Sequence, residues 1–175
     1  MLRSMLFVPA DSERKLVKAE SAGADAVILD LEDSVLPEHK PAARVMACDY
    51  MHCHKAGPPL WVRINDLASG ELLRDLAAVV PARPAGIILP KIRGPEDVTR
   101  VANYLEMLET VHGFVAGCIG VLALVTETPS AVLRMGELVQ TLVPRLTGVG
   151  WGAEDLSSAL GAGDPTVPGG RCMRM

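Results

Sequence analysis

Aromatic residues are scarce in this chain of 175 residues, because they account for only 3% of it. Basic residues do not dominate either, since 17 lysines and arginines stand against 21 aspartates and glutamates, for a formal net charge of −4. Domains that bind nucleic acid are usually basic, and many of them stack aromatic side chains on bases. The composition therefore argues against nucleic acid as a partner.

No apolar run is long enough to cross a membrane. A spanning helix needs about 20 apolar residues, whereas the longest candidate, 113–125, contains three glycines and is about 13 residues long. We therefore expect no membrane partner. The N-terminal segment does not resemble a signal peptide, because Asp11 introduces charge before any long apolar region. Together with only four cysteines, this favours a cytoplasmic protein with reduced thiols.

Apolar residues, in contrast, are abundant. They make up 49% of the chain, charged residues make up 22%, and the mean hydropathy is +0.26. A chain of this length and composition can bury one substantial core, and its apolar content argues against disorder. No interior linker or low-complexity segment divides it, so we predict a single domain over residues 1–175.

Six short apolar runs, rich in Val, Ile and Leu, recur along the chain. Most are continuously apolar rather than alternating, which is typical of parallel strands buried on both faces. Segments of helical length lie between them, often with proline near the start and glycine after the end. The predicted strands are 3–8, 25–31, 59–64, 85–89, 119–125 and 146–151, and the predicted helices are 11–22, 41–55, 71–80, 95–111 and 129–143.

The alternation of strand and helix repeats about every 29 residues and contains no hairpin signal. This pattern fits two α/β architectures, a doubly wound parallel sheet and a (β/α)₈ barrel. Eight such units need roughly 230 residues. As a barrel, the chain would therefore be present only through about strand six.

Charged and polar residues follow five of the predicted strands. Ligand sites of parallel α/β folds lie at the carboxyl ends of the strands, so we expect these side chains to face one site. The residues are Asp30, Glu32, Asp33, Arg63, Asn65, Lys91, Glu127 and Asp155.

Glu127 and Asp155 follow neighbouring strands of this predicted sheet. Two carboxylates that lie close together repel each other unless one holds a proton or a cation joins them. Mg²⁺ suits two carboxylates completed by water and substrate oxygens, and the lack of His and Cys at the strand ends argues against zinc. Arg63 offers a planar fork that can hold a substrate carboxylate.

Simpler roles remain open for each of these residues. Glu127 can favour the dipole of the helix that follows it, and Asp155 can cap the next helix. Arg63 can pair with the acidic residues that end the neighbouring strand. Lys91 can be a solvated loop lysine.

Six motifs, in this order, resemble those of the citrate lyase beta-subunit-like family, which belongs to the phosphoenolpyruvate/pyruvate-type TIM barrel superfamily. Each motif is short, but together they span nearly the whole chain. The motifs are RSMLFVPAD at 3–11, DAVILDLEDSV at 25–35, WVRIN at 61–65, GIILPKI at 86–92, VTETP at 125–129 and GAEDLSSALG at 152–161.

The resemblance implies an α/β fold of the (β/α)₈ TIM barrel type and a Mg²⁺-dependent carbon–carbon lyase. Members cleave citryl, malyl or citramalyl thioesters of CoA or a carrier protein into an acetyl-type thioester and a 2-oxo acid. They are usually homotrimers or hexamers. Which thioester this chain would use stays open, because its basic residues form no clustered patch in the sequence.

The resemblance also implies site roles for five residues. Arg63 would hold the substrate, and Glu127 would bind both Mg²⁺ and substrate, which makes these two the expected catalytic residues. Asp155 would be the second metal ligand. Glu32 and Asp33 match acidic positions on the substrate side that order metal-bound water.

The chain departs from the family pattern in one respect. Members continue to strands seven and eight and to a C-terminal candidate catalytic aspartate. We therefore expect residues 1–175 to form one barrel domain that lacks its last two βα units. The alternatives are a metal-dependent aldolase or thioesterase acting on related acids, or a non-catalytic truncated subunit.

Overall fold

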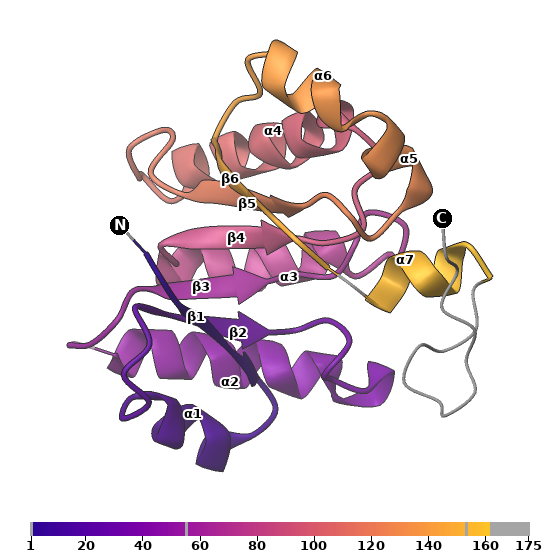
Figure 1. Cartoon of the computed structure of the whole chain (residues 1–175). Coiled ribbons are helices and arrows are strands. Elements are labelled where there is room, and N and C mark those ends of the chain that lie inside the picture. The colour runs from indigo at the N-terminus through magenta and orange to yellow at the C-terminus, as the bar shows by residue number, and fades with distance from the viewer. Residues whose placement is uncertain (1, 55, 153, 162–175) are drawn as a thin grey trace, which may run out of the picture.

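Six parallel strands form one sheet whose spatial order follows the order of the sequence (Figure 1). The structure, a computed structural model, describes residues 2–54, 56–152 and 154–161, so residues 162–175 of the predicted domain lie outside the described residues. The strands are β1 (Met5–Pro9), β2 (Ala26–Asp30), β3 (Leu60–Arg63), β4 (Gly86–Leu89), β5 (Gly120–Leu124) and β6 (Leu146–Gly150).

The sequential order decides between the two predicted architectures. A doubly wound sheet reverses its strand order at a switch point, whereas here each strand pairs with the next one in the chain, from β1 to β6. The fold is therefore that of a (β/α) barrel through strand six. The sheet does not close, and β1 and β6 are its two edges in the described part of the chain.

Helices alternate with the strands; α1 to α6 lie outside the sheet, whereas α7 lies at the carboxyl ends of the strands (Figure 1). The helix predicted over 95–111 is confirmed with the same bounds. The helices are α1 (Glu13–Ala19), α2 (Lys40–Cys53), α3 (Leu72–Val79), α4 (Pro95–Val111), α5 (Pro129–Leu133), α6 (Met135–Gln140) and α7 (Glu154–Ala159), with the 3₁₀ turns η1 (Pro37–His39) and η2 (Val80–Ala82). No helix among these combines the length and the apolar character needed to cross a bilayer.

The helix predicted over 129–143 is wrong in its continuity, because α5 and α6 are separated at Arg134. Arg134 has φ −106 and ψ 9. Its guanidinium is held by Glu96 at 2.5 Å and by Glu137 at 2.7 Å. The break therefore coincides with the ion pair between Arg134 and Glu96 of α4, which the local sequence does not predict.

The alternation of side chains along each strand separates two apolar clusters. On the helix side, residues such as Val27 and Leu29 of β2 join the main core. On the inner side, Ala26 and Ile28 pack with Trp61 of β3 and with residues of β4 and β5. Asp30 and Arg63 continue this inner series at the ends of β2 and β3, so the pleat presents their side chains at the mouth of the sheet.

The opposite, amino-terminal end of the sheet is fastened by a buried ion pair. Glu109 of α4 is fully buried and accepts hydrogen bonds from both terminal nitrogens of Arg145, at 2.7 and 2.8 Å. It also accepts the backbone N–H groups of Gly117 and Ile119. Burial alone would raise the pKa of Glu109, but these donors outweigh it and lower the pKa to about 2. The pair links α4 to the starts of β5 and β6.

Arg145→Met should lower the free energy of unfolding by about 3–5 kcal/mol, because it leaves a buried carboxylate without its partner. The contribution of Glu109 exists above the ordinary carboxyl pKa and is lost as the pH falls towards about 2. Urea unfolding at pH 7 and at pH 3 measures both effects. Arg3→Met breaks an exposed pair with Asp25 and should cost less than about 1 kcal/mol. Equal losses in the two variants would contradict this account.

Candidate functional site

The carboxyl ends of the strands bring the predicted site residues to one rim. Parallel pairing places all these ends on the same side of the sheet, and contacts between side chains from different loops confirm that they meet there. Asp30 and Arg63 end β2 and β3, Glu32 and Asp33 follow β2, Lys91 follows β4, Glu127 follows β5, and Asp155 lies in α7 after β6.

Arg63 is held by acidic neighbours. Its Nε and Nη2 donate to the two carboxylate oxygens of Asp30, at 2.7 and 2.6 Å, and its Nη1 lies 2.9 Å from Glu32 Oε2. The guanidinium also lies over the Phe7 ring, 4.9 Å from the centroid. A guanidinium carries five N–H donors, so these contacts leave N–H groups on Nη1 and Nη2 for a ligand. Arg63 therefore pairs with the acidic residues after β2, as the simpler structural role predicts, and it still has N–H groups that could bind a substrate.

Asp30 is 1% exposed, which would by itself raise its pKa. The hydrogen bonds and charge of Arg63 outweigh burial and lower the pKa of Asp30 below its ordinary value. Asp30 also accepts the backbone N–H of Glu32 at 3.0 Å. It therefore stays charged at neutral pH and fixes both the fork of Arg63 and the start of the following loop.

Lys91 lies at the centre of the rim. Its Nζ is 2.7 Å from Glu32 Oε1 and 3.0 Å from both oxygens of Asp33, and it is 3.7 Å from Asp155 Oδ1. The backbone of Lys91 has φ +52, and its N–H donates to Glu127 Oε2 at 2.7 Å. The interpretation of Lys91 as a solvated loop lysine is therefore wrong.

Glu32 is the carboxylate most perturbed by this environment. It is 3% exposed and lies between Lys91 and Arg63, although neither of its oxygens makes a hydrogen bond of good geometry. Burial outweighs the attraction of both cations and raises the pKa of Glu32 to about 7. The proton affinity of this carboxyl group is therefore well above that of an ordinary glutamate.

Glu127 is 4% exposed and faces a second acidic residue. Burial raises its pKa above the ordinary value, the N–H of Lys91 opposes that effect, and the charge of Asp155 raises the pKa further. Both acidic residues lie beside Lys91, because its N–H donates to Glu127 and its Nζ is 3.7 Å from Asp155 Oδ1. That the two carboxylates approach closely enough to share a cation stays a prediction.

The end of β6 is tied directly to the end of β5 beside Glu127. Thr126 Oγ1 donates to the Gly152 carbonyl and accepts the Gly152 N–H, both at 2.8 Å. A Cβ at position 152 would lie 2.5 Å from Glu127 Cγ and Oε1, so only glycine allows this approach. The reciprocal bonds fix the spacing between the segments that carry the two carboxylates.

The donor set around Glu127 and Asp155 fits a hard divalent cation. Both residues offer carboxylate oxygens, and a cation between them would relieve the repulsion that raises the pKa of Glu127. The described residues contain no group of three or more metal-ligating side chains. An ion held here would therefore take its remaining ligands from water or substrate, which is how Mg²⁺ is commonly bound.

Of the two simpler roles, the helix-dipole role of Glu127 stays a prediction, because Glu127 directly precedes the residue that caps α5, whereas the capping role of Asp155 does not fit the structure. Thr128, not Glu127, caps α5, because its side chain accepts the N–H of Ala131. Asp155 is the second residue of α7 rather than the residue before it.

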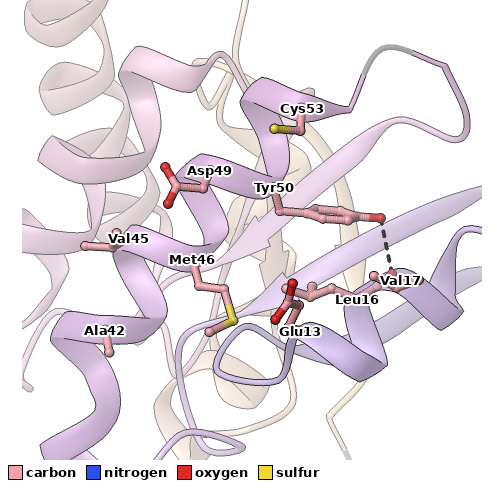
Figure 2. A pocket seen from close by; sticks show the side chains of 9 residues that line it. All are labelled: Glu13, Leu16, Val17, Ala42, Val45, Met46, Asp49, Tyr50 and Cys53. Carbon is pink, nitrogen blue, oxygen red and sulfur yellow. Dashed lines mark hydrogen bonds between the residues drawn. The ribbon is translucent and has the colours of Figure 1, made fainter.

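One pocket adjoins this rim, and another lies away from it. One, of about 420 Å³, is lined by Lys91 and Thr128 together with Arg93, Arg100 and Asp66, and it adjoins the charged residues described above. A groove of about 660 Å³ lies between α1 and α2 on the outside of the molecule. Figure 2 shows its side chains, with Tyr50 donating to the Leu16 carbonyl at 3.3 Å. It contains none of the rim residues, and we do not assign the site to it.

Lys91 and Asn65 lie at the rim, as their positions after β4 and β3 predict, but the sequence does not indicate which residues they contact. Lys40 carries no such signal, because its partners are brought together only by the fold, as in the 2.5 Å contact from Lys40 Nζ to Asn65 Oδ1.

Comparison with known proteins gives a consistent result. A family model described as HpcH/HpaI aldolase/citrate lyase matches residues 3–167. The chain is 32% identical over 166 residues to a (3S)-malyl-CoA thioesterase of Cereibacter sphaeroides, covering 91% of this chain and 52% of that protein. It is 35% identical over 159 residues to the citrate lyase subunit beta of Escherichia coli K12, covering 87% and 50%. The chain thus spans about half the length of these curated relatives.

A solved structure supports the same relationship. Protein CitE from Mycobacterium tuberculosis, in complex with magnesium and acetoacetate, superposes with a TM-score of 0.73 at 33% identity, covering 95% of this chain and 60% of that one. That relative therefore binds the metal for which the rim of this chain has a suitable donor set.

Lys91→Met should raise the pKa of Glu32 above about 7, because the ammonium group of Lys91 stabilises the charged form of this carboxylate. Carboxyl ¹³C chemical shifts followed through a pH titration measure it. Lys18→Met, which removes an exposed lysine outside the rim, is the matched control and should leave the titration unchanged. A Glu32 pKa that stays constant or falls in Lys91→Met would show that Lys91 does not neutralise it.

Proposed function

Because this chain belongs to the HpcH/HpaI aldolase/citrate lyase family, we propose that it is a Mg²⁺-dependent lyase that cleaves the carbon–carbon bond of a 3-hydroxyacyl thioester. The substrates are citryl-, malyl- or citramalyl-type thioesters of CoA or a carrier protein. The products are an acetyl-type thioester and a 2-oxo acid. The relatives named citrate lyase and malyl-CoA thioesterase support this substrate class.

One observation of the structure carries the proposal. Glu127 and Asp155 both lie beside Lys91 at the rim, where Glu127 accepts its backbone N–H and Asp155 Oδ1 is 3.7 Å from its Nζ, and Arg63 lies on the same rim with N–H groups left over. We assign Glu127 and Asp155 as the residues that hold Mg²⁺. The relative solved with magnesium and acetoacetate supports this assignment.

Cleavage of the substrate proceeds through proton transfer, carbon–carbon bond breaking and protonation of the enolate. The hydroxyl of the substrate loses its proton to a base, the adjacent carbon–carbon bond breaks, and its electron pair moves to the carbon beside the thioester carbonyl. Mg²⁺, when bound, stabilises negative charge on the carboxylate and hydroxyl oxygens of the acid. The enolate of the departing thioester then takes a proton at carbon to give the acetyl-type thioester.

The residues of this chain have distinct roles in that scheme. Arg63 binds the carboxylate of the substrate through its remaining N–H groups, while its hydrogen bonds to Asp30 hold the guanidinium in place. Glu32 and Asp33 lie on the substrate side and accept hydrogen bonds from water around the metal. Lys91 keeps these two acidic residues together, because its ammonium group contacts both.

The whole assembly is also part of the proposal. We propose that residues 1–175 supply six βα units of an eight-unit barrel, as one domain that assembles as a homotrimer or hexamer in the cytoplasm. The open edges β1 and β6 support the first point. Mass spectrometry of the intact polypeptide and of the native particle tests the length and the copy number.

A thioesterase is the second candidate, and the name of the Cereibacter relative favours it. In that reaction water cleaves the thioester bond, so the hydroxy acid leaves intact together with a free thiol. The metal and the arginine would bind the same acid in both reactions, and the products distinguish them.

With Mg²⁺ and each of the three CoA thioesters, we expect a 2-oxo acid and acetyl-CoA from at least one substrate, no free thiol, and loss of turnover in EDTA. Hydrazone formation detects the oxo acid, and a thiol reagent detects free CoA. Glu127→Gln should be inactive, whereas Glu106→Gln, which alters an exposed glutamate of α4, should retain activity. Free thiol with intact hydroxy acid would identify a thioesterase. Magnesium binding without turnover would indicate a non-catalytic subunit.

A further inference from the structure

A series of hydrogen bonds runs beneath the rim without touching Glu127 or Asp155. It begins at Lys40, the first residue of α2. The Nζ of Lys40 donates to the carbonyls of Leu31 and Glu32, at 3.0 and 3.1 Å, and to Asn65 Oδ1 at 2.5 Å. An ammonium group has three donors, so all of them are used. Two of them hold the consecutive carbonyls on either side of the Glu32 α-carbon.

Asn65 connects this lysine to a buried carboxylate. Its side-chain amide donates to the Leu31 carbonyl at 2.9 Å and to Asp75 Oδ2 at 2.7 Å, and its backbone N–H donates to the same oxygen at 2.7 Å. Asn65 is 3% exposed and Asp75 is fully buried. The orientation of the amide is therefore fixed, with its oxygen facing Lys40.

Arg44, one turn after Lys40 on the same face of α2, completes the series. Its Nε donates to Asp75 Oδ1 at 2.7 Å, and its Nη2 pairs with Glu71. Arg44 is 7% exposed, so the pair with Asp75 is buried and would be costly to break from one side. The helices α2 and α3 are thus locked to the loops that follow β2 and β3.

We propose that Lys40 is a positioning residue for Glu32, and that Asn65 and Asp75 hold Lys40 in place for this purpose. This inference rests on the proposed function, because it assigns Glu32 to the substrate side of the site. The carboxylate of Glu32 is reached by Arg63 and Lys91 only while its backbone stays where Lys40 holds it. Lys40 bonds to the carbonyls of the loop and not to the carboxylate, so it sets the position of Glu32 rather than its charge.

The proposal separates two effects of losing Lys40. Without the ammonium group, the two carbonyls and the Asn65 oxygen lose a shared donor, and the loop over residues 31–33 becomes free to move. Glu127 and Asp155 keep their contacts, because none of the bonds that hold them involves Lys40. Metal binding should therefore survive, and binding of the oxo acid beside Glu32 should not.

The experiment compares Lys40→Met with Lys40→Arg and with Arg145→Met. Arg145→Met breaks a buried ion pair at the far end of the strands, so it destabilises the fold without altering the rim. The first measurement is amide hydrogen exchange of the protein without ligands. Lys40→Met should accelerate exchange at Leu31 and Glu32 about tenfold or more. Arg145→Met should do so at Gly117 and Ile119 instead, whose N–H groups bond to Glu109.

The second measurement is calorimetric binding of Mg²⁺ alone, and of pyruvate in the presence of Mg²⁺. Lys40→Met should weaken pyruvate binding about tenfold or more while Mg²⁺ affinity stays within about twofold. Lys40→Arg keeps the charge and the donors and should restore most of the loss. A purely structural role would lower the melting temperature in both Lys40→Met and Arg145→Met and leave pyruvate affinity alike in the two.

Each outcome has a clear meaning. Unchanged exchange at Leu31 and Glu32 in Lys40→Met, or equal acceleration there in Arg145→Met, would overturn the positioning role. If Lys40→Met does not fold, Asn65→Ala removes the link to Asp75 and must give the same local acceleration. If the wild-type protein binds neither Mg²⁺ nor pyruvate, the proposed function fails, whereas the exchange data still decide whether Lys40 holds the Glu32 loop.

Discussion

Carboxylates at the rim of the sheet can lie together only because cations lie among them. Glu32, Asp33 and Asp155 all approach the ammonium group of Lys91. Arg63 balances Asp30 and Glu32 on the other side. Unpaired charges on the buried residues Asp30 and Glu32 would be expensive, so the cations allow these two carboxylates to lie together. Glu127 is the rim carboxylate whose charge is not balanced, because no basic side chain lies within ion-pair distance of it in the described structure. Burial and the charge of Asp155 raise its pKa. A divalent cation would balance the charge of Glu127.

Support for the rim comes from a second layer that is made of fixed polar pairs. Lys40, Asn65, Asp75 and Arg44 hold the loops after β2 and β3 from beneath. Thr126 and Gly152 hold the ends of β5 and β6 against each other. Preorganised side chains are effective because the protein does not have to reorder them when charge develops in a reaction. The pair between Glu109 and Arg145 plays a separate role at the other end of the strands, where it stabilises the fold without touching the site.

The sequence predicts the strands well because each one is a continuous apolar run. All six are confirmed within two residues of their expected ends, and the helix over 95–111 begins at a proline and has the bounds expected for it. The convergence of Glu32, Arg63, Glu127 and Asp155 follows from parallel pairing alone. The sequence could not reveal which cation serves which carboxylate. That depends on Lys91 adopting φ +52 and on contacts between residues such as Arg63 and Asp30, which are 33 positions apart.

Two further features lie beyond local sequence for the same reason. The division between α5 and α6 coincides with the contact from Arg134 to Glu96, 38 positions away, and no proline or glycine occupies the break. The burial of Asp75 depends on Arg44 and Asn65, which belong to different elements. Helical periodicity places Asp75 on the buried face of α3 without indicating what would compensate its charge.

We propose that Glu127 and Asp155 hold one and the same divalent cation. Calorimetric titration of Mg²⁺ into the wild-type protein, Glu127→Gln, Asp155→Asn and the double variant tests it most directly. If both carboxylates share an ion, each single variant should lose affinity about tenfold or more, and the double variant should lose much less than the product of the two losses. Wild-type affinity in either single variant, or losses that simply multiply in the double variant, would contradict a shared site.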